Sequence, residues 1–251
     1  MLIVRSALFL LLVTLLTIPF GILVSLAMIF PMKIRYAIIA AWRVGFMSLC
    51  ASVLNIRYRV LGRENIPQHP SVILSKHQSA WETVALQEIF PPLVFVLKNA
   101  LLRIPFFGWG LAAMKMISID RRAGKDALKQ VVDQGRDRLQ AGFWVVIFPE
   151  GTRVAPGEKR RYKPGGVHLA VQTGALLVPV AHDAGEVWGK NAFLKTPGLI
   201  TVSIGPAINP AGRTEATLNA LAEAWIESEM HRLSPHRYPP PSSEVSDGAE
   251  N

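Results

Sequence analysis

The feature that most constrains this chain is a long stretch without charge near its N-terminus. No charged residue occurs from Ser6 to Met32. As a helix, the apolar residues 7–30 would be roughly 36 Å long at 1.5 Å per residue, which is enough to cross a bilayer or to enter it deeply. A cleaved signal peptide is the alternative, but its apolar region is expected to span only ~7 to 15 residues, and no small-residue cleavage site follows this one. The sequence therefore predicts a retained membrane anchor.

Two residues that disfavour helix interrupt the middle of this apolar stretch. Pro19 lacks a backbone donor, and Gly21 follows two residues later. We expect either one kinked helix or two short segments that meet within the membrane, and the sequence leaves both arrangements open.

The next segment mixes apolar and basic residues. Lys33, Arg35 and Arg43 stand among apolar residues together with Trp42. This composition is typical of a helix at the lipid headgroup level, although an ordinary core helix has a similar pattern. Because these cations outnumber Arg5, which precedes the apolar stretch, the positive-inside rule places the rest of the chain in the cytoplasm. We therefore predict that residues 1–54 form membrane-anchoring helices.

The composition narrows the class of partner. Hydrophobic residues make up 50% of the chain, the formal net charge is +9 and the pI is about 10.0. Either nucleic acid or an anionic membrane surface attracts such a charge. Nucleic acid is disfavoured, because the aromatic residues lie mostly in apolar runs and no basic recognition helix or RNA-binding signature is present. The single cysteine, Cys50, excludes an intrachain disulfide and is predicted to be a buried, inert thiol.

Beyond Asn55 the sequence alternates β-rich runs with helical stretches. A helix is predicted over residues 124–142, where apolar residues recur near a 3.6-residue period. The predicted strands, which belong to a sheet covered on both faces, span residues 71–75, 93–97, 116–120, 143–148, 175–181 and 199–205. This alternation predicts an α/β domain over residues 55–232. Residues 233–251 are rich in Pro, Ser and acidic side chains, so we predict a disordered tail there.

Polar residues follow several of the predicted strands. Ligands of open α/β sheets bind beyond the carboxyl ends of the strands, so these positions are candidates for a site. The residues concerned are Lys76, His77, Glu82, Lys98, Asp120, Arg121, Arg122, Glu150, Thr152, Arg153, His182 and Asp183. Because loops are usually polar in any case, this grouping alone indicates a site without defining it.

Two short motifs define the site more sharply. "HQSAWE" places four residues between His77 and Glu82, and "FPEGTR" follows some seventy residues later. In the second motif, Gly151 gives a flexible backbone and Thr152 a hydroxyl. Arg153 adds a guanidinium that can hold a phosphate by paired charge-assisted hydrogen bonds. In isolation this motif would be a surface turn with an ion pair, and its combination with the histidine motif is the stronger signal.

With these motifs in this order, the chain resembles the glycerolipid acyltransferase family, in particular its bacterial 1-acylglycerol-3-phosphate acyltransferases. Residues 97–122 are similar to the second block of that family and "LLVPVAH" (176–182) to its fourth, so the resemblance spans roughly residues 77–182. It implies a mixed α/β sheet covered by helices and preceded by N-terminal membrane-associated helices. It also implies a location at the bacterial inner membrane, with the catalytic domain facing the cytoplasm.

The activity implied by the resemblance is acyl transfer. A fatty acyl group would pass from an acyl thioester to the 2-hydroxyl of 1-acyl-sn-glycerol-3-phosphate, giving phosphatidic acid for phospholipid biosynthesis. The expected co-substrate is acyl-CoA or an acyl carrier protein thioester, and the expected partners are membrane lipids. No cofactor, metal or nucleic acid is expected, since His77 and Glu82 lack the two-histidine spacing of a zinc site and the other histidines are scattered.

By the same resemblance, His77 and Glu82 form the catalytic pair. Glu82 would hold one tautomer of His77, and His77 would take the proton from the acceptor hydroxyl, as in a Ser-His-Asp triad. The substrate alcohol is then the nucleophile, so no acyl-enzyme is needed and Ser79 is expected to be structural. The usual carboxylate of the family is Asp. Glu82 is one methylene longer and can still accept a hydrogen bond from the imidazole.

The resemblance also assigns the residues that bind the substrate phosphate. Lys98 and Arg153 are expected to grip it, and Arg121 is an additional contact. The full expected set is Lys98, Arg121, Glu150, Gly151, Thr152 and Arg153.

The roles of two further segments stay open. The apolar stretch 104–110 is either a wall of the trough for the acyl chains or part of the core. The segment 158–163 carries four cations in six residues. Anionic lipid headgroups, an acidic acyl carrier protein or plain solvation would each explain it.

Three rival functions are compatible with parts of the sequence. A related acyltransferase could act on another lyso-lipid, such as a lyso-ornithine lipid. A membrane-bound lipid hydrolase could use His77 to activate water. A non-catalytic lipid-binding protein would need neither the histidine nor the carboxylate.

Overall fold

The sheet is the scaffold of the domain. The computed structural model describes residues 1–90, 92–120 and 123–238, and these residues form one seven-stranded sheet in the order β1-β7-β6-β2-β5-β3-β4. Neighbouring strands run parallel except for β6 and β7, which pair antiparallel. The strands are β1 Ile56–Leu61, β2 Val72–Ser75, β3 Leu93–Lys98, β4 Ile117–Ile119, β5 Trp144–Ile147, β6 Leu177–His182 and β7 Gly198–Ile204. The expected mixed α/β sheet is confirmed.

The central strands are apolar along their whole length because both faces of the sheet are covered. Val72, Ile73 and Leu74 of β2 have no exposed surface. β1 was not predicted, and its burial pattern explains why. It is an edge strand that alternates buried Ile56 with the exposed Arg57, so it lacks the continuous apolar run of the central strands.

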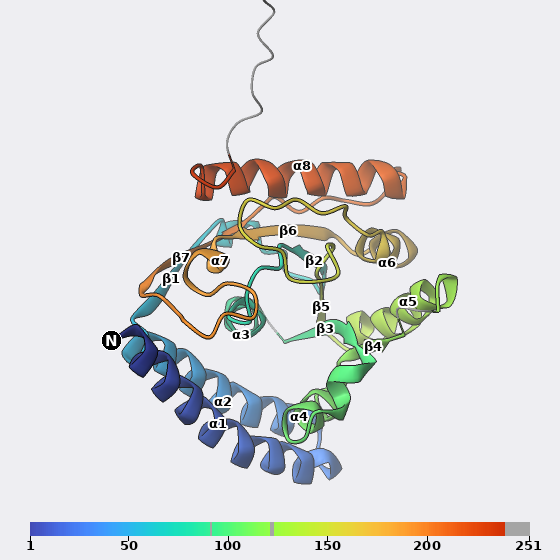
Figure 1. Ribbon diagram of the computed structural model, residues 1–251. Helices are drawn as coiled ribbons and strands as arrows, with labels where there is room; N and C mark the ends of the chain where they lie inside the picture. Colours follow the sequence, from blue (N-terminus) through green and yellow to red (C-terminus); the bar gives the residue numbers. More distant parts are fainter. Residues whose placement is uncertain (91, 121–122, 239–251) are drawn as a thin grey trace, which may run out of the picture.

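Helices cover the two faces of the sheet (Figure 1). On one face α8 packs on β6 and on α6, and α5 packs on α6; on the other face α3 contacts α2. The helices of the domain are η2 Arg63–Asn65, α3 Glu82–Ile89, η3 Asn99–Arg103, α4 Phe107–Ala113, α5 Lys125–Gln140, α6 Gly165–Thr173, α7 Ala184–Val187 and α8 Glu215–Leu233. The helix predicted over 124–142 corresponds to α5.

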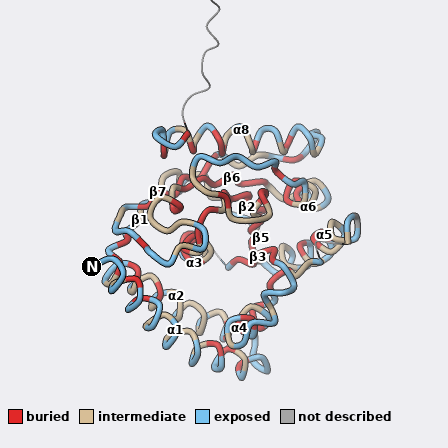
Figure 2. The backbone as a smooth tube through the Cα atoms, in the orientation of Figure 1, coloured by how far each residue is buried: buried red, intermediate tan, exposed pale blue. Residues whose placement is uncertain are grey.

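The N-terminal residues form a helical hairpin beneath the domain (Figure 1). α1 spans Leu2–Leu26 as one helix that continues through Pro19, the short η1 covers Ala27–Ile29, and α2 spans Met32–Ser52. Of the two arrangements left open by the sequence, the structure has the single helix. Both α1 and α2 are long and apolar enough to cross a membrane. Figure 2 shows that much of α1 is exposed, and the exposed side chains are largely apolar, as Leu11, Leu15 and Leu26 illustrate.

α1 contacts the domain near both of its ends. Near its start, Phe9 is buried against Trp188, with ring centroids 5.4 Å apart. Near its end, a Cβ on Gly21 would lie 2.7 Å from the carbonyl oxygen of Phe106, so only glycine allows this approach of α1 to the start of α4. The two contact points are 12 residues apart, which corresponds to about 18 Å along a helix.

Two arginines of α2 join the hairpin to the domain. The buried Arg35 donates from Nη1 to the carbonyl oxygen of Ala113 at 2.6 Å, and Arg43 donates from Nη1 to that of Gln87 at 2.7 Å. These two side chains are therefore engaged by the domain, whereas Lys33 is exposed. Of the three cations on which the predicted orientation rests, only Lys33 is therefore an exposed flanking charge. Cys50, also on α2, is buried, in line with its predicted state.

The packed domain extends past the end of α8. Tyr238 is 5% exposed, and its hydroxyl accepts a hydrogen bond from Nε2 of Gln78 at 3.1 Å. Tyr238 belongs to the segment predicted as a tail from residue 233. The low apolar content of that segment did not reveal that this one aromatic side chain returns to the domain. Residues 239–251, which make up the rest of the predicted tail, lie outside the described residues.

Candidate active site

His77 lies in the loop that leaves β2, at the carboxyl end of the strand. The backbone N–H of Lys76 still donates to the carbonyl oxygen of Val180 on the neighbouring β6, at 2.9 Å. The carbonyl oxygen of His77 accepts from the N–H of Val154, at 2.8 Å, directly after the "FPEGTR" motif. The two motifs that lie some seventy residues apart in the sequence are therefore joined through their backbones.

The carboxylate of Glu82 reaches back from the first turn of α3 into this loop. Its Oε1 lies 2.7 Å from Nδ1 of His77 and accepts from the backbone N–H groups of Gln78 and Ser79, each at 3.0 Å. Its Oε2 accepts from the N–H of Ser79 at 3.0 Å, and the side chain has no exposed surface. The extra methylene of Glu relative to Asp is thus accommodated by a carboxylate that the backbone holds in place.

The protonation of Glu82 follows from these partners. Burial alone raises the pKa of this carboxyl group, but the imidazoles of His182 and His77 and the N–H of Ser79 outweigh burial and hold the pKa below its ordinary value. Glu82 is therefore ionised at neutral pH. An ionised carboxylate at Nδ1 keeps the proton of His77 on that nitrogen, so Nε2 is the ring atom available as a base.

Ser79 supports this loop from inside. It has no exposed surface, and its Oγ accepts from the N–H of Trp81 at 3.2 Å. Its hydroxyl is thus turned into the protein, as expected of a structural residue.

The imidazole of His77 stacks on an aromatic side chain that sequence reasoning missed. The rings of His77 and Phe148 have centroids 3.8 Å apart and an interplanar angle of 13°. Phe148 stacks in turn on Phe95, with centroids 5.9 Å apart. The side chain of His77 is 14% exposed, so one part of the ring is held and another part opens outward. The position of Phe148 in the first place of "FPEGTR" was the only signal in the sequence.

His77 opens into an apolar cavity of about 510 Å³ between the domain and the hairpin. Both parts contribute walls: Trp42 comes from α2, while Phe95 and Met114 come from the domain. From the stretch 104–110, Phe106, Phe107 and Gly110 line the cavity. Ile104, Phe107 and Trp109 are all more than 40% exposed. Of the two alternatives for this stretch, the structure favours the wall of a trough.

Polar residues of the "FPEGTR" motif line the same cavity near His77. Gly151, Thr152 and Arg153 line it together with Lys98 at the end of β3. Gly151 has a φ of +69°, a conformation that favours glycine. Within the described residues, neither the ammonium of Lys98 nor the guanidinium of Arg153 has a hydrogen-bond or ion-pair partner. The structure therefore brings both predicted phosphate-binding cations to the catalytic pair and leaves them available to a ligand.

Glu150 belongs to a different cluster. Its Oε1 lies 3.2 Å from Nζ of Lys76, which also lies 2.8 Å from Oε1 of Glu227 on α8, and the hydroxyl of Tyr162 donates to the same Glu227 oxygen at 2.8 Å. The Lys76 side chain has no exposed surface. Burial raises the pKa of Glu150 to about 7, against the opposing effect of Lys76. The carboxyl group of Glu150, predicted to shape the phosphate pocket, thus faces Lys76. Its residue also lines the second cavity described below.

The remaining predicted residues have other places. Arg121, together with Arg122, lies outside the described residues. His182 is buried and its Nε2 donates to the carbonyl oxygen of Lys76 at 2.8 Å, and burial lowers the pKa of its imidazole. Asp183 accepts from the N–H of Thr201 at 2.7 Å. His182 and Asp183 therefore serve the fold at the strand ends.

A second, polar cavity of about 710 Å³ adjoins the first. The two share Lys98, Gly151, Thr152 and Lys190 in their walls. Within the part of the chain that the structure describes, no three His, Cys, Asp or Glu residues lie together in a way that could hold a metal ion.

Comparisons with known proteins bear on this arrangement. The sequence model of the family described as "Acyltransferase" matches residues 57–183. A 1-acyl-sn-glycerol-3-phosphate acyltransferase from Pseudomonas aeruginosa is 46% identical over 237 residues, which cover 92% of each chain. The human 1-acyl-sn-glycerol-3-phosphate acyltransferase alpha is 30% identical over 171 residues, 67% of this chain and 60% of the human protein.

A solved structure has the same fold. The crystal structure of the 1-acyl-sn-glycerophosphate (LPA) acyltransferase PlsC from Thermotoga maritima matches with a TM-score of 0.78 and 21% identity, covering 93% of this chain and 96% of that one. The match includes most of the chain, hairpin and sheet together.

Proposed function

This chain belongs to the acyltransferase family, and we propose that it transfers a fatty acyl group from an acyl thioester to the 2-hydroxyl of 1-acyl-sn-glycerol-3-phosphate, forming phosphatidic acid. One observation carries the proposal. The His77–Glu82 pair opens into a cavity whose wall contains Lys98 and Arg153, two cations without a partner among the described residues, and apolar side chains over most of the rest. This is the combination that a lipid with a phosphate headgroup requires.

His77 is the general base of the reaction. Its Nε2 accepts the proton of the 2-hydroxyl as the oxygen attacks the thioester carbonyl, while Glu82 stabilises the imidazolium that forms. The tetrahedral intermediate then collapses: the carbon–sulfur bond breaks, and the imidazolium returns its proton to the departing thiolate. An ester and a free thiol result, and His77 is neutral again.

Lys98 and Arg153 bind the acceptor's phosphate. Because neither cation is engaged by a described residue, neither has to break an existing ion pair to do so. The phosphate contact fixes the glycerol backbone so that the 2-hydroxyl lies near Nε2 of His77. The acyl chains lie in the apolar trough lined by Phe106, Phe107 and Met114.

The hairpin holds the domain on the membrane. Because α1 contacts the domain near both ends, its axis is tied along the domain surface, and its exposed apolar side chains are free to enter one leaflet. The net charge of +9 favours an anionic surface such as the cytoplasmic leaflet of a bacterial inner membrane. This placement opens the trough, which the hairpin helps to form, next to the lipid acceptor.

The first experiment measures acyl transfer by the purified protein in detergent. Labelled acyl-CoA and 1-acylglycerol-3-phosphate are the substrates, and His77→Ala, checked for an unchanged thermal unfolding midpoint, is the control. We expect wild type to form phosphatidic acid and the variant to be slower by at least about 10³-fold. Equal rates for the two proteins would contradict the role of His77.

The same assay separates the rival functions. Release of free fatty acid without an acceptor would indicate a hydrolase. Transfer to a lyso-ornithine lipid in preference to 1-acylglycerol-3-phosphate would replace the proposed acceptor. An acyl carrier protein thioester serves as an alternative donor in a parallel reaction.

A further inference from the structure

The second cavity is lined by cations that the proposed acceptor does not need. Besides Lys98, which it shares with the acceptor site, its wall contains the exposed residues Arg103, Arg160, Lys163 and Lys190. Within the described residues, none of these four side chains has a hydrogen-bond or ion-pair partner. Two acidic residues line the same cavity: Asp120, and Glu150, whose carboxyl group is buried against Lys76. Cations therefore outnumber carboxylates in this recess.

The loop that carries two of these cations is fixed to the domain. The N–H of Val154 donates to His77 at one end of the loop, and the N–H of Lys163 donates to the carbonyl oxygen of Pro149 at 2.9 Å at the other end. Between them, Tyr162 is 2% exposed and its hydroxyl is bonded to Glu227. Arg160 and Lys163 are thus presented from a backbone held on both sides.

The four cations of the basic segment 158–163 have different surroundings. Lys159 forms an ion pair with Glu223 of α8 at 3.1 Å, and Arg161 is exposed without lining either cavity. Only Arg160 and Lys163 of this segment face the recess. Solvation alone therefore does not account for all four cations of this segment.

The reaction proposed above needs two anions at once. The acceptor brings one phosphate, for which Lys98 and Arg153 are available, and the thioester donor brings the phosphates of its carrier. Resting on the proposed function, we propose that the second cavity binds the 3′-phosphoadenosine diphosphate end of a coenzyme A thioester, with Arg103, Arg160, Lys163 and Lys190 as its anion-binding residues. The pantetheine arm then passes over Gly151 and Thr152, which line both cavities, toward His77.

The shape of the site favours a nucleotide over a protein partner. A recess of about 710 Å³ is within the range of small-ligand pockets, which is ~300 to 1,000 Å³. A carrier protein would dock on an extended surface of roughly 800 Å² per partner. Ala100 and Ile119 add apolar wall on which a purine ring can pack.

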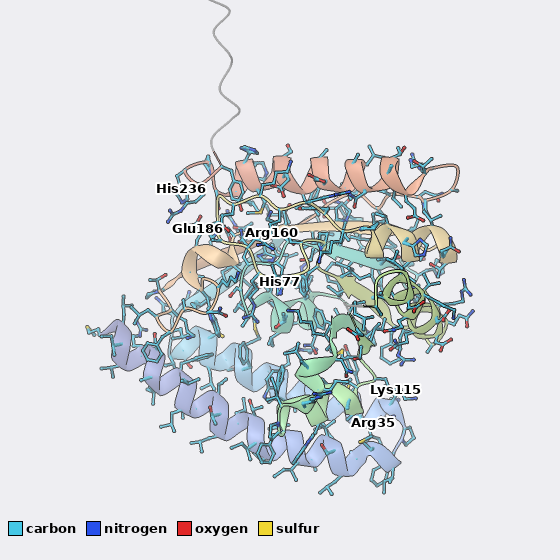
Figure 3. All side chains as sticks on the ribbon, turned by 45° about the vertical axis from the view of Figure 1, so that its right-hand side comes forward. Arg35, His77, Lys115, Arg160, Glu186 and His236 are labelled. Atoms are coloured by element: carbon cyan, nitrogen blue, oxygen red, sulfur yellow. The ribbon has the colours of Figure 1, made fainter. Side chains whose placement is uncertain are left out.

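The position of the site suits a water-soluble group. In Figure 3, Arg160 lies on the side of His77 away from α1 and α2. The donor's charged end would therefore approach from the aqueous side, while the lipid acceptor approaches from the side of the hairpin. Membrane headgroups would be expected at the hairpin side instead.

Direct binding tests the site without catalysis. Adenosine 3′,5′-bisphosphate is titrated calorimetrically into the full-length protein in detergent, with adenosine as the ligand control. We expect Arg160→Gln and Lys163→Gln each to weaken its binding by about 5- to 10-fold, as for the net loss of one solvent-accessible hydrogen bond. Arg161→Gln, which removes the same charge from the same loop outside the cavity, should leave the Kd unchanged. Equal affinities in all four proteins would overturn the proposal.

Kinetics of the same variants identify which substrate the cavity serves. We expect the KM for acyl-CoA to rise by about 5- to 10-fold in Arg160→Gln and Lys163→Gln, with kcat and the KM for 1-acylglycerol-3-phosphate changed by less than about 2-fold. A rise in the acceptor's KM instead would assign the cavity to the acceptor phosphate, and a rise only with acyl carrier protein thioesters would assign it to protein docking. Either result would overturn the proposal.

Failure of the site and failure of the proposed function give different results. If no phosphatidic acid forms but adenosine 3′,5′-bisphosphate binds with the expected variant pattern, the cavity is a nucleotide site and the proposed reaction is wrong. If phosphatidic acid forms but binding and KM are the same in all variants, the reaction stands and the cavity assignment is wrong.

Discussion

Two groups of buried charge lie at the carboxyl ends of β2 and β5, and Lys76 of one group directly precedes His77 of the other. In the catalytic pair, the carboxylate of Glu82 is held by backbone N–H groups, and its partner His77 opens into the cavity. In the closed cluster, which consists of Lys76, Glu150, Glu227 and Tyr162, the ammonium of Lys76 lies between the carboxyl groups of Glu150, which has no exposed surface, and Glu227, whose side chain is 11% exposed.

The difference shows that adjacency in a motif does not determine a role. Lys76 and His77 are consecutive, yet one joins β2 to α8 and the other faces the apolar cavity. Charge that faces a cavity is available for chemistry. The buried ammonium of Lys76 instead links the ends of β2 and β5 through its ion pair with Glu150. The attraction between these groups must offset the free-energy cost of removing them from water.

The largest effect is expected from disturbing the catalytic pair. In Glu82→Gln, one carboxylate oxygen becomes an NH₂ group. Beside Nδ1 of His77 it favours the wrong tautomer, beside the Ser79 N–H it opposes a donor, and in both orientations the charge that stabilises the imidazolium is lost. We expect kcat to fall by about 10³- to 10⁴-fold, as for Asp-to-Asn changes in serine protease triads, with KM changed little. Steady-state acyl transfer measures both constants. Glu82→Asp, which keeps the charge, should retain more activity than Glu82→Gln, and an unaltered rate in Glu82→Gln would remove Glu82 from the mechanism.

The closed cluster should respond in stability. Lys76→Met leaves the carboxyl groups of Glu150 and Glu227 buried without their cation, so we expect a loss of about 3 to 5 kcal/mol in the free energy of unfolding. Denaturant unfolding in detergent provides the measurement. The triple variant that also carries Glu150→Gln and Glu227→Gln should recover most of this loss. The specific activity per folded molecule of Lys76→Met should fall far less than that of Glu82→Gln. A larger loss of activity in Lys76→Met would contradict the distinction between the closed cluster and the catalytic pair.

The pH dependence of stability should differ in sign between the two buried carboxyl groups. Burial raises the pKa of Glu150 from 4.5 to about 7, so the folded protein binds its proton more tightly than the unfolded chain. Stability from this group is therefore present below pH ~4.5 and declines as the pH rises to about 7, by up to about 3 kcal/mol. Glu82 has a lowered pKa, so its contribution is present above the ordinary carboxyl pKa and is lost as the pH falls through the lowered value.

Glu150→Gln isolates that dependence. The difference in thermal unfolding midpoint between the variant and wild type should change from pH 5 to pH 8, with the variant gaining relative to wild type as the pH rises. A difference that is constant over this range would show that Glu150 does not titrate there.

The smallest effect is expected from the ring that supports His77. Phe148→Leu removes the stacking contact, which we expect to lower kcat by about 2- to 10-fold, since aromatic pairs contribute about 0.5 to 1.5 kcal/mol. Phe95→Leu leaves the His77–Phe148 contact in place and should cost less. Initial rates at saturating substrate give the comparison. Equal losses of kcat in both variants would show that the substitutions act through the shape of the trough and not through the position of the imidazole.

Much of the fold was readable from local patterns. The six predicted strands correspond to β2 to β7, and the helix over 124–142 to α5, because apolar runs and helical periodicity report burial directly. β1 was missed because Arg57 and its neighbours give an edge strand a polar alternation. The burial of Tyr238 was missed because one aromatic side chain does not alter the composition of a segment.

The candidate site was likewise predictable from the sequence only in part. By itself, the sequence determined the residue types, their order and their spacing, since "HQSAWE" and "FPEGTR" carry the proposed base, its carboxylate and the proposed phosphate-binding Arg153 in local sequence. Only the tertiary structure decided which way each side chain faces. Residues far apart in the chain meet in three places: in the ion pair of Lys76 with Glu227, in the contact of Arg35 with α4, and in the cavity wall that the hairpin helps to form. Such contacts depend on how strands and helices are placed in space, and a linear pattern carries no record of that placement.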